Sequence, residues 1–206
     1  MARPRSVTDE EILAAARRCF LERGASVPAS EIARELGVTH TTVFNRFKSK
    51  EALLIAALGP PEVLPWAAKL DAGPDGRPVR EQLEEIGRAM ADYFRHIATG
   101  LAVLHAAGLG PRQVFRGRAE PTPVQAFRAL TGWLRRARRR GLIGPVDVEV
   151  LASTVIGALH SRAFTEMLTG VPLPDDGGRA FPARFFELLW SGISPNGNSP
   201  KKEMHP

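Results

Sequence analysis

A short polar stretch near the N-terminus carries side chains suited to contact with nucleic acid. If residues 39–47 form a helix, its outward positions hold short hydrogen-bonding side chains, which can reach base edges or phosphates in a DNA groove. A solvated helix face is the alternative interpretation, and it applies most strongly to the single histidine. The candidates for reading DNA are Thr39, His40, Thr41, Thr42 and Asn45.

The first helix expected in this region is marked by its capping residues. Thr8 and Glu11 stand three residues apart, the spacing of a capping box, which predicts a helix from about Asp9. Gly24 is placed to end it, since glycine readily adopts the positive φ found at helix C-termini. Cys19 falls among the apolar positions of this helix, so we expect it in the core.

Three shorter helices are predicted next. Pro28 and Gly37 bound the first of them, and Ser26 is a capping candidate for it. Residues 39–47 follow, capped by Thr39, and Ser49 caps a further helix that reaches about residue 58. Two short helices joined by a glycine turn and packed on a longer helix predict a helix-turn-helix, whose second helix enters a DNA major groove.

The sequence of this region resembles a known family. Residues 32–39 read IARELGVT, residues 43–47 read VFNRF, and residues 50–54 read KEALL. These segments resemble the DNA-binding domain of the TetR family of bacterial transcriptional regulators, without gaps from about residue 31 to residue 58.

The resemblance implies roles for two further positions. In the family, a tyrosine hydroxyl and a lysine usually hold backbone phosphates at the positions of Phe44 and Lys50. Phe44 has no hydroxyl, so this phosphate contact is either absent or supplied by the guanidinium of Arg46. Arg3 and Arg5 flank Pro4 and resemble an arm that reaches an adjacent minor groove, although such arms are also often disordered.

The remainder of the chain shows the apolar spacing of further helices. We expect helices over residues 79–97, ended by Gly100, then 101–107, 124–140, 146–169 and 180–192. Residues 59–78 read as a broken connection with a short helix near Pro65, and 108–123 as a loop with one helical turn. The arginine run at 135–140 is interpreted as a solvated helix end, because cations favour the helix C-terminus, and contact with nucleic acid is the alternative.

The last two predicted helices are apolar on more than one side, so each needs two packing partners. A small domain supplies one partner, and a symmetric second copy supplies the other. The sequence therefore predicts an all-α homodimer with residues 1–58 as a helix-turn-helix DNA-binding domain, 59–193 as a helical effector-binding and dimerisation domain, and 194–206 as a disordered tail. The resemblance implies the same layout, in which the last two helices pair into a four-helix bundle. The expected dimer contacts are Leu151, Val155, Leu159, Phe185, Leu188 and Leu189.

A ligand-responsive regulator needs an effector pocket in its middle helices. Apolar and aromatic side chains with a few polar groups are typical of small-molecule sites, although such residues are more often plain core. The two histidines among them have no cysteine or carboxylate partner at ligand spacing, so we expect no metal site and no cofactor. The pocket candidates are Trp66, Met90, Phe94, His105, Phe127, Trp133, His160 and Phe164.

Composition narrows the remaining choices. The 206 residues have a net charge of +6, which favours a polyanionic partner, and one cysteine, which fits a reducing compartment. Residues 1–18 hold seven charged side chains, and no apolar run reaches the 18 residues of a membrane span. We therefore expect a cytoplasmic protein with no membrane partner.

The functional prediction is a DNA-binding transcriptional regulator. No nucleophile elbow, phosphate-binding glycine loop or His-Glu-x-x-His motif occurs, so we expect no enzyme. A dimeric repressor released from a palindromic operator by an apolar or aromatic effector is the leading hypothesis. Activation and corepression follow from the same parts, and a DNA-silent adaptor or an unfamiliar all-α enzyme remain the alternatives.

Overall fold

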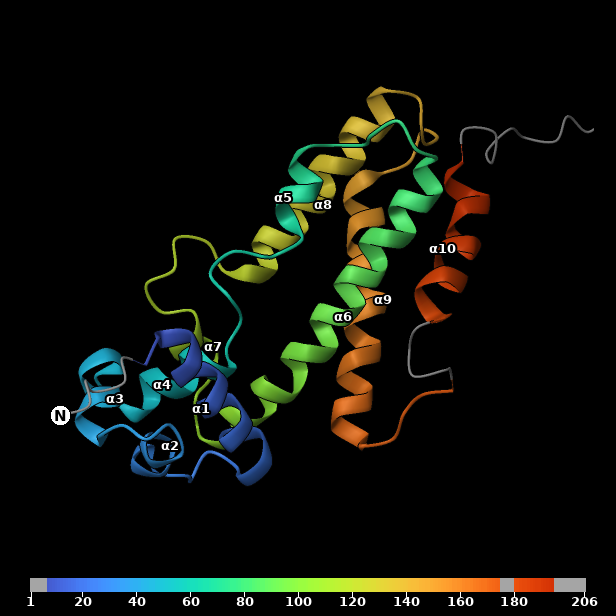
Figure 1. Ribbon diagram of the computed structural model, residues 1–206. Coiled ribbons are helices and arrows are strands. Elements are labelled where there is room, and N and C mark those ends of the chain that lie inside the picture. The colour runs from blue at the N-terminus through green and yellow to red at the C-terminus, as the bar shows by residue number, and fades with distance from the viewer. Residues whose placement is uncertain (1–6, 175–179, 195–206) are drawn as a thin grey trace, which may run out of the picture. The chain divides into compact units, whose positions relative to one another are not determined.

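The computed structural model describes residues 7–174 and 180–194, and all regular structure in these residues is α-helical (Figure 1). The predicted all-α class is thereby confirmed. The chain divides into two compact units. Unit 1 comprises residues 1–61 and 96–119, and unit 2 comprises residues 62–95 and 120–206.

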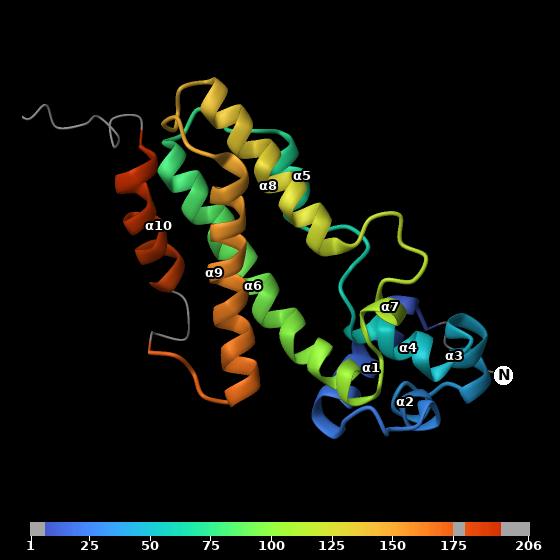
Figure 2. The same cartoon turned by 180° about the vertical axis from the view of Figure 1, so that it is seen from behind.

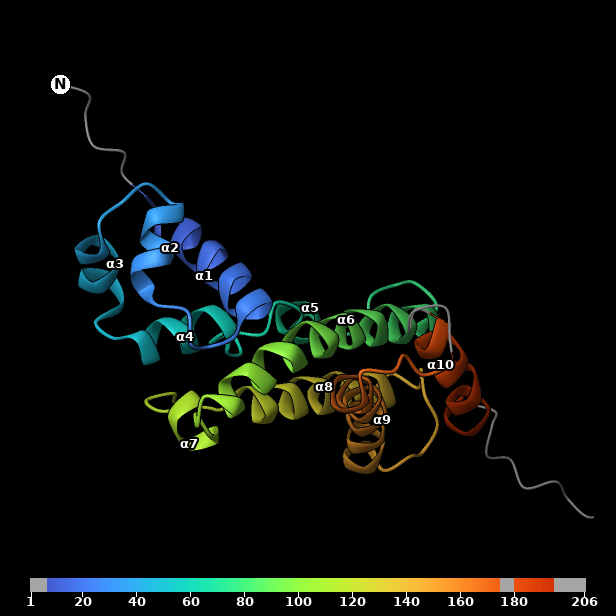
Figure 3. The same ribbon diagram turned by 90° about the horizontal axis from the view of Figure 1, so that it is seen from below.

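Unit 1 holds the predicted helix-turn-helix (Figure 3). Its helices are α1 (Asp9–Arg23), α2 (Ala29–Glu35), α3 (His40–Phe47), α4 (Lys50–Leu58), α7 (Pro111–Val114) and the last part of α6 (Val79–Ala106). The first four begin and end close to the predicted positions, because their capping residues set the limits locally.

Three of the predicted caps form. The Thr8 hydroxyl accepts from the Glu11 N–H at 3.1 Å, and the Glu11 carboxylate accepts from the Thr8 N–H at 2.8 Å. Ser49 Oγ accepts from the Ala52 N–H at 3.0 Å and starts α4, and Thr39 caps α3 in the same way. The expected cap by Ser26 is wrong: Pro28 is the N-cap of α2, with no side-chain hydrogen bond.

The core of unit 1 draws on more of the chain than the first 58 residues. Ile12, Phe20 and Leu58 are fully buried, and Leu104 from the end of α6 is buried in the same cluster. Val114 on α7 joins them. Residues 96–119 therefore pack with the helix-turn-helix, whereas the sequence alone assigns them to the second domain, because the contacts are long-range in sequence.

Cys19 is buried, as expected, but its thiol has polar partners. Sγ donates to Glu35 at 3.1 Å and accepts from Arg23 at 3.3 Å, which links α1 to α2. Burial raises the pKa of the Cys19 thiol, and the hydrogen bond to Glu35 raises it further. The thiol is therefore protonated at neutral pH and a poor nucleophile.

Unit 2 is a bundle of longer helices (Figures 1 and 2). The first part of α6 lies alongside α9, α5 packs against α8, and α10 lies against α6. Large apolar side chains fill the space between them, with Met90, Leu130 and Trp133 fully buried. The helices not yet given bounds are α5 (Ala67–Asp71), α8 (Thr122–Arg139), α9 (Val148–Thr169) and α10 (Ala180–Ile193).

Helix α6 corrects one sequence prediction. Gly100 does not end a helix there, because α6 continues to Ala106 as one element. A Cβ atom on Gly100 would lie 2.4 Å from the Leu58 carbonyl oxygen at the end of α4. The glycine therefore permits close packing of α6 on α4 within unit 1, and does not act as a stop signal.

Two further expectations concern membrane-spanning helices and the C-terminal tail. None of the helices in the described ranges is long and apolar enough to cross a membrane. The predicted disordered tail lies outside the described residues apart from Ser194.

Candidate functional site

Helix α3 is held on unit 1 by its inward side. Val43 is 1% exposed and Phe47 is half-buried against the core that α1, α2 and α4 share. Gly37, with φ at 68°, makes the tight turn between α2 and α3. The packing leaves the opposite side of α3 facing outward (Figure 3).

The outward side of α3 carries the residues predicted to read DNA. Thr39, His40, Thr41, Phe44, Asn45 and Arg46 are exposed. Thr42 is half-buried, and its hydroxyl lies 2.9 Å from that of Thr39, which in turn accepts from the Thr42 N–H at 3.2 Å. Thr39 and Thr42 therefore stabilise the start of the helix, which leaves His40, Thr41 and Asn45 as the polar groups most open to base edges.

The electrostatics of α3 favour an anion. Its first turn carries no acidic side chain, whereas the first turns of α1, α2 and α4 each carry at least one. The unsatisfied N–H groups and the positive end of the helix dipole are thus open to a phosphate.

Lysines lie beside α3. Lys50 Nζ donates to the Ser26 carbonyl at 2.9 Å, which ties α4 to the loop before α2. Lys48 Nζ donates to the Asn45 carbonyl at 2.5 Å. Within the part of the chain that the structure describes, neither lysine forms an ion pair with a carboxylate. Each ammonium therefore keeps charge and donors for a phosphate.

Arg46 differs from Lys48 and Lys50. Its guanidinium pairs with Asp9 of α1 at 2.5 Å, so it braces α3 against α1. The structure therefore does not support the expectation that Arg46 supplies the phosphate contact of the missing tyrosine hydroxyl, because its guanidinium is already paired. Arg3 and Arg5, the predicted minor-groove arm, lie outside the described residues.

Sequence reasoning missed two cations. Lys48, with φ at 63°, ends α3, and Arg34 on α2 is exposed and forms no ion pair within residues 7–174 and 180–194. The spacing Lys48-Ser49-Lys50 was the available signal, since a lysine two residues from a phosphate candidate is itself a candidate. Arg34 gave no signal beyond its position on a helix.

Four of the pocket candidates form one aromatic row in unit 2, joined by Tyr93. Ring centroids are 6.4 Å apart for Trp66 and Tyr93, 5.6 Å for Tyr93 and Phe94, 5.4 Å for Phe94 and His160, and 5.9 Å for His160 and Phe164. The row runs from buried Trp66 to exposed Phe164. Tyr93 was not predicted as a site residue, although it is adjacent to Phe94.

The other pocket candidates do not join this row. Met90 and Trp133 are fully buried in the core of unit 2. Phe127 on α8 is 36% exposed, and His105 is exposed and belongs to unit 1.

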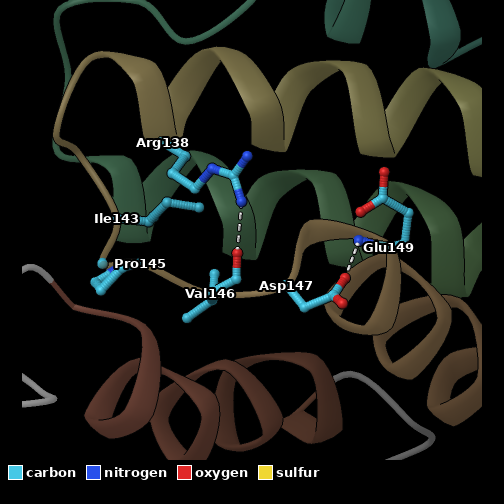
Figure 4. Close-up of a pocket in the computed structure, with 7 residues that line it drawn as sticks. Arg138, Ile143, Pro145, Val146, Asp147 and Glu149 are labelled. Carbon is cyan, nitrogen blue, oxygen red and sulfur yellow. Dashed lines mark hydrogen bonds between the residues drawn. The ribbon is translucent and has the colours of Figure 1, made fainter.

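The cavities of the described residues lie elsewhere. An open pocket of about 560 Å³ lies at the loop between α8 and α9, where Arg138 donates to the Val146 carbonyl and Asp147 accepts from the Glu149 N–H (Figure 4). The third charged residue that lines it, Glu149, pairs with Arg135, so all three charged side chains of the lining already have partners within the protein. The polar side chains of this pocket therefore stabilise the loop, and we do not assign a ligand to it.

The arginine run is more than a solvated helix end. Arg136 donates to the Leu70 carbonyl at 2.5 Å, Arg140 donates to the Pro74 carbonyl, and Arg135 pairs with Glu149. These contacts fasten the 62–78 connection and the start of α9 to α8. The run therefore stabilises unit 2. Because these arginines have a structural role, their contribution to the positive net charge does not require a nucleic-acid partner.

The expected dimer contacts divide into two groups. Leu151, Val155 and Leu159 are at most 7% exposed and pack inside unit 2, so they face its own core. Phe185 and Leu189 are half-buried, and Leu188 is 74% exposed. The exposed apolar residues on α9 are instead Val150, Phe164 and Leu168.

A capped, outward-facing α3 with no acidic side chain in its first turn, held on a three-helix core, is the arrangement of a helix-turn-helix DNA-binding domain. Residues 12–57 match the family model described as bacterial regulatory proteins, tetR family. The DNA-binding segment of the chain therefore matches the TetR family, which confirms the resemblance found in the sequence, and the fold of the described residues is all-helical.

Solved structures show the same fold over nearly the whole chain. A TetR transcriptional regulator from Streptomyces coelicolor is 27% identical, with 92% of this chain and 99% of that chain covered and a TM-score of 0.56. A TetR family transcriptional regulator from Pseudomonas syringae is 22% identical, with 91% and 99% covered and a TM-score of 0.61. The fatty acid degradation regulator FadR from Bacillus halodurans is 17% identical, with 91% and 96% covered and a TM-score of 0.62. No curated protein matches the chain.

Proposed function

We propose that this regulator is a homodimeric repressor that binds a palindromic operator and leaves it when a small apolar or aromatic effector binds unit 2. The observation that carries the DNA-binding part is the outward face of α3, exposed and without an acidic group in its first turn. A cytoplasmic location follows from this role.

Dimerisation is supported by the exposed apolar side chains of the last two helices. Phe164 and Leu168 are 45% and 65% exposed on α9, and Leu188 is 74% exposed on α10. Large exposed apolar side chains on two neighbouring helices favour a protein interface there. An isologous contact through these helices would bury each group twice, once on each copy.

We expect Leu168→Glu to convert a dimer into a monomer, because a carboxylate would be buried at both symmetric copies of the contact. A loss of at least a hundredfold in dimer affinity is expected, corresponding to about 3 kcal/mol. Sedimentation equilibrium measures it. Val63→Glu is the matched control, since Val63 is 71% exposed in unit 2 but lies outside α9 and α10. Unchanged self-association of Leu168→Glu would remove α9 from the interface.

The effector part rests on the aromatic row. Trp66 is 6% exposed, and its indole N–H has no hydrogen-bond partner within the described residues. A buried donor without an acceptor is unfavourable, and a ligand oxygen or nitrogen would satisfy it. Rings from Trp66 to Phe164 suit a planar apolar effector with an acceptor group at its buried end.

Release would be a population shift. Helix α6 contributes residues 79–95 to unit 2 and residues 96–106 to unit 1. The same helix therefore carries Phe94, which belongs to the aromatic row, and Gly100, which packs against the end of α4. An effector that favours one arrangement of α6 would change the spacing of the two α3 helices of a dimer. The match to half-sites about one or more helical turns apart would then be lost.

The decisive experiment selects bound duplexes from a random-sequence pool, followed by a salt titration of the winner against scrambled DNA. Enrichment of a palindrome supports a dimeric sequence-specific regulator, and the winner then serves to screen planar effectors by release. Weak salt-sensitive binding without enrichment would favour a DNA-silent adaptor or an enzyme.

Variants of α3 and α4 separate the reading of base sequence from the affinity for phosphates. Asn45→Ala should lose about 1–3 kcal/mol of preference for the selected operator over random duplex, because its amide contacts a base edge. Lys50→Ala should weaken both duplexes alike and lower the salt slope by about one, because it contacts a phosphate. Fluorescence anisotropy at several salt concentrations measures both. Full selectivity in Asn45→Ala would refute its assignment as a reading residue.

A further inference from the structure

An apolar ring stands on the outward face of α3 among polar side chains. Phe44 is 52% exposed, while Thr41 and Asn45 beside it are polar and exposed as well. His40, one helical turn earlier, is also exposed and stacks on Phe44, with centroids 6.1 Å apart and an interplanar angle of 28°. The two rings form an aromatic platform on the outward face of α3.

The chemistry of the groove limits what this platform can contact. A phenyl ring neither donates nor accepts an ordinary hydrogen bond, so it gains nothing from phosphates or from the polar atoms of base edges. The 5-methyl group of thymine is the apolar feature of the major groove, and phenylalanine is among the residues that contact it. Arg46 does not convert this position into a phosphate site, because Asp9 holds its guanidinium.

We propose that Phe44, held in place by His40, is a specificity-determining residue that packs on a thymine 5-methyl group in each half-site. The inference rests on the proposed function, since it requires α3 to lie in the major groove. Phe44 makes the contact, and His40 is a positioning residue that fixes the ring.

The neighbour of Phe44 extends the inference to the base sequence. Asn45 is the next residue and is exposed, and an asparagine amide suits the edge of adenine. A thymine methyl and an adenine edge read by adjacent residues predict an A·T pair, or two neighbouring A·T pairs, within each half-site.

The test uses the selected operator with each thymine replaced in turn by deoxyuridine, which removes the methyl group and keeps the hydrogen-bonding edge. Binding of the full chain is measured by fluorescence anisotropy for the unchanged protein and for Phe44→Ala. The unchanged protein should lose about fourfold at one thymine of a half-site, the value expected for one buried methyl, and about sixteenfold when both half-sites are altered. Phe44→Ala should show no loss at that thymine and keep its sensitivity at any others.

Two further variants test the parts of the platform. His40→Ala should reduce the ratio of thymine to deoxyuridine affinities while Phe44 is still present, which a merely structural role on the helix would not do. Phe44→Tyr restores the hydroxyl, and tighter binding with the thymine preference lost would mean that the ring serves the phosphate backbone instead. Val63→Ala, at an exposed apolar residue in unit 2, is the control and should change neither ratio.

The outcomes distinguish this inference from the function beneath it. A selection that enriches no duplex would overturn both. An enriched palindrome with equal affinity for thymine and deoxyuridine at every position would overturn the role of Phe44 alone. So would a loss that is the same in Phe44→Ala as in the unchanged protein.

Discussion

Gly87→Leu is expected to destabilise the protein by about 2–4 kcal/mol. Gly87 lies on α6 in unit 2, where a Cβ atom would come within 2.1 Å of Phe186 Cε2 and 2.9 Å of its Cζ. Phe186 is 2% exposed, so its ring has no room to move aside within the core. Expelling the ring forfeits about 3–5 kcal/mol of burial, and the loss of a helical glycine returns about 1 kcal/mol.

Urea denaturation at fixed protein concentration measures this loss, because the midpoint of a dimer depends on concentration. Gly132→Leu is the matched control: its nearest neighbour would be Arg136 Nη1 at 3.6 Å, an ordinary contact, so it should be neutral or slightly stabilising. Phe186→Ala in the Gly87→Leu background should recover at least about 1 kcal/mol relative to additivity. Equal stability of the two leucine variants would disprove close packing of α10 on α6.

The helices of unit 1 were predictable because their limits are set by neighbours in sequence. A cap such as Thr8 with Glu11 needs only residues three apart, and Gly24 needs only its own backbone. The outward side of α3 followed from the same periodicity. Local rules were thus enough for the helix-turn-helix and for most of the residues on the outward side of α3.

The rest depends on contacts between distant residues. Arg46 finds Asp9 across 37 positions, so its role as a brace could not be read from the neighbourhood of Phe44. In the sequence, Gly100 cannot be distinguished from a glycine that ends a helix. Its role in the close packing of α6 on α4 is visible only when both helices are placed. The sequence does not show whether Leu151 and Leu159 face the core or the surface, because the side chains on both sides of α9 are mostly apolar or small.

The arginines after residue 134 show the same limitation. A basic run before a glycine satisfies the rule for a helix C-terminus, and the sequence offers no reason to look further. The carbonyl groups of Leu70 and Pro74 that accept from Arg136 and Arg140 are 66 residues away. Charge counted along the sequence therefore overestimates the positive charge that is available to DNA.

The junction of α4 with α6 is where we expect a change away from the outward face of α3 to weaken DNA binding. Gly100 approaches the Leu58 carbonyl closely, and Arg17 of α1 donates to the Ala57 carbonyl at 3.1 Å and to the His96 carbonyl at 2.9 Å. Burial lowers the pKa of this guanidinium, which nevertheless stays charged. The end of α4 is thus held to α6 both by shape and by two charge-assisted hydrogen bonds.

Gly100→Ala should therefore weaken operator binding at least tenfold, about 1.4 kcal/mol. The new methyl would lie 2.4 Å from a backbone oxygen, which cannot rotate away as a side chain can, so α4 must shift. Because α4 packs on α1 and α3, the shift moves the reading helix. Arg17→Met should act in the same direction, since it removes both hydrogen bonds to the junction.

Two observations separate this expectation from unfolding. The helical circular dichroism signal should be unchanged while anisotropy reports the loss of operator affinity, because unfolding of unit 1 would remove the helices α1 to α4. Gly192→Ala on α10, where a Cβ meets nothing within 4 Å, is the control and should bind as the unchanged protein does. Operator affinity retained by Gly100→Ala would mean that α6 does not set the position of α4, and that an effector signal must reach α3 by another route.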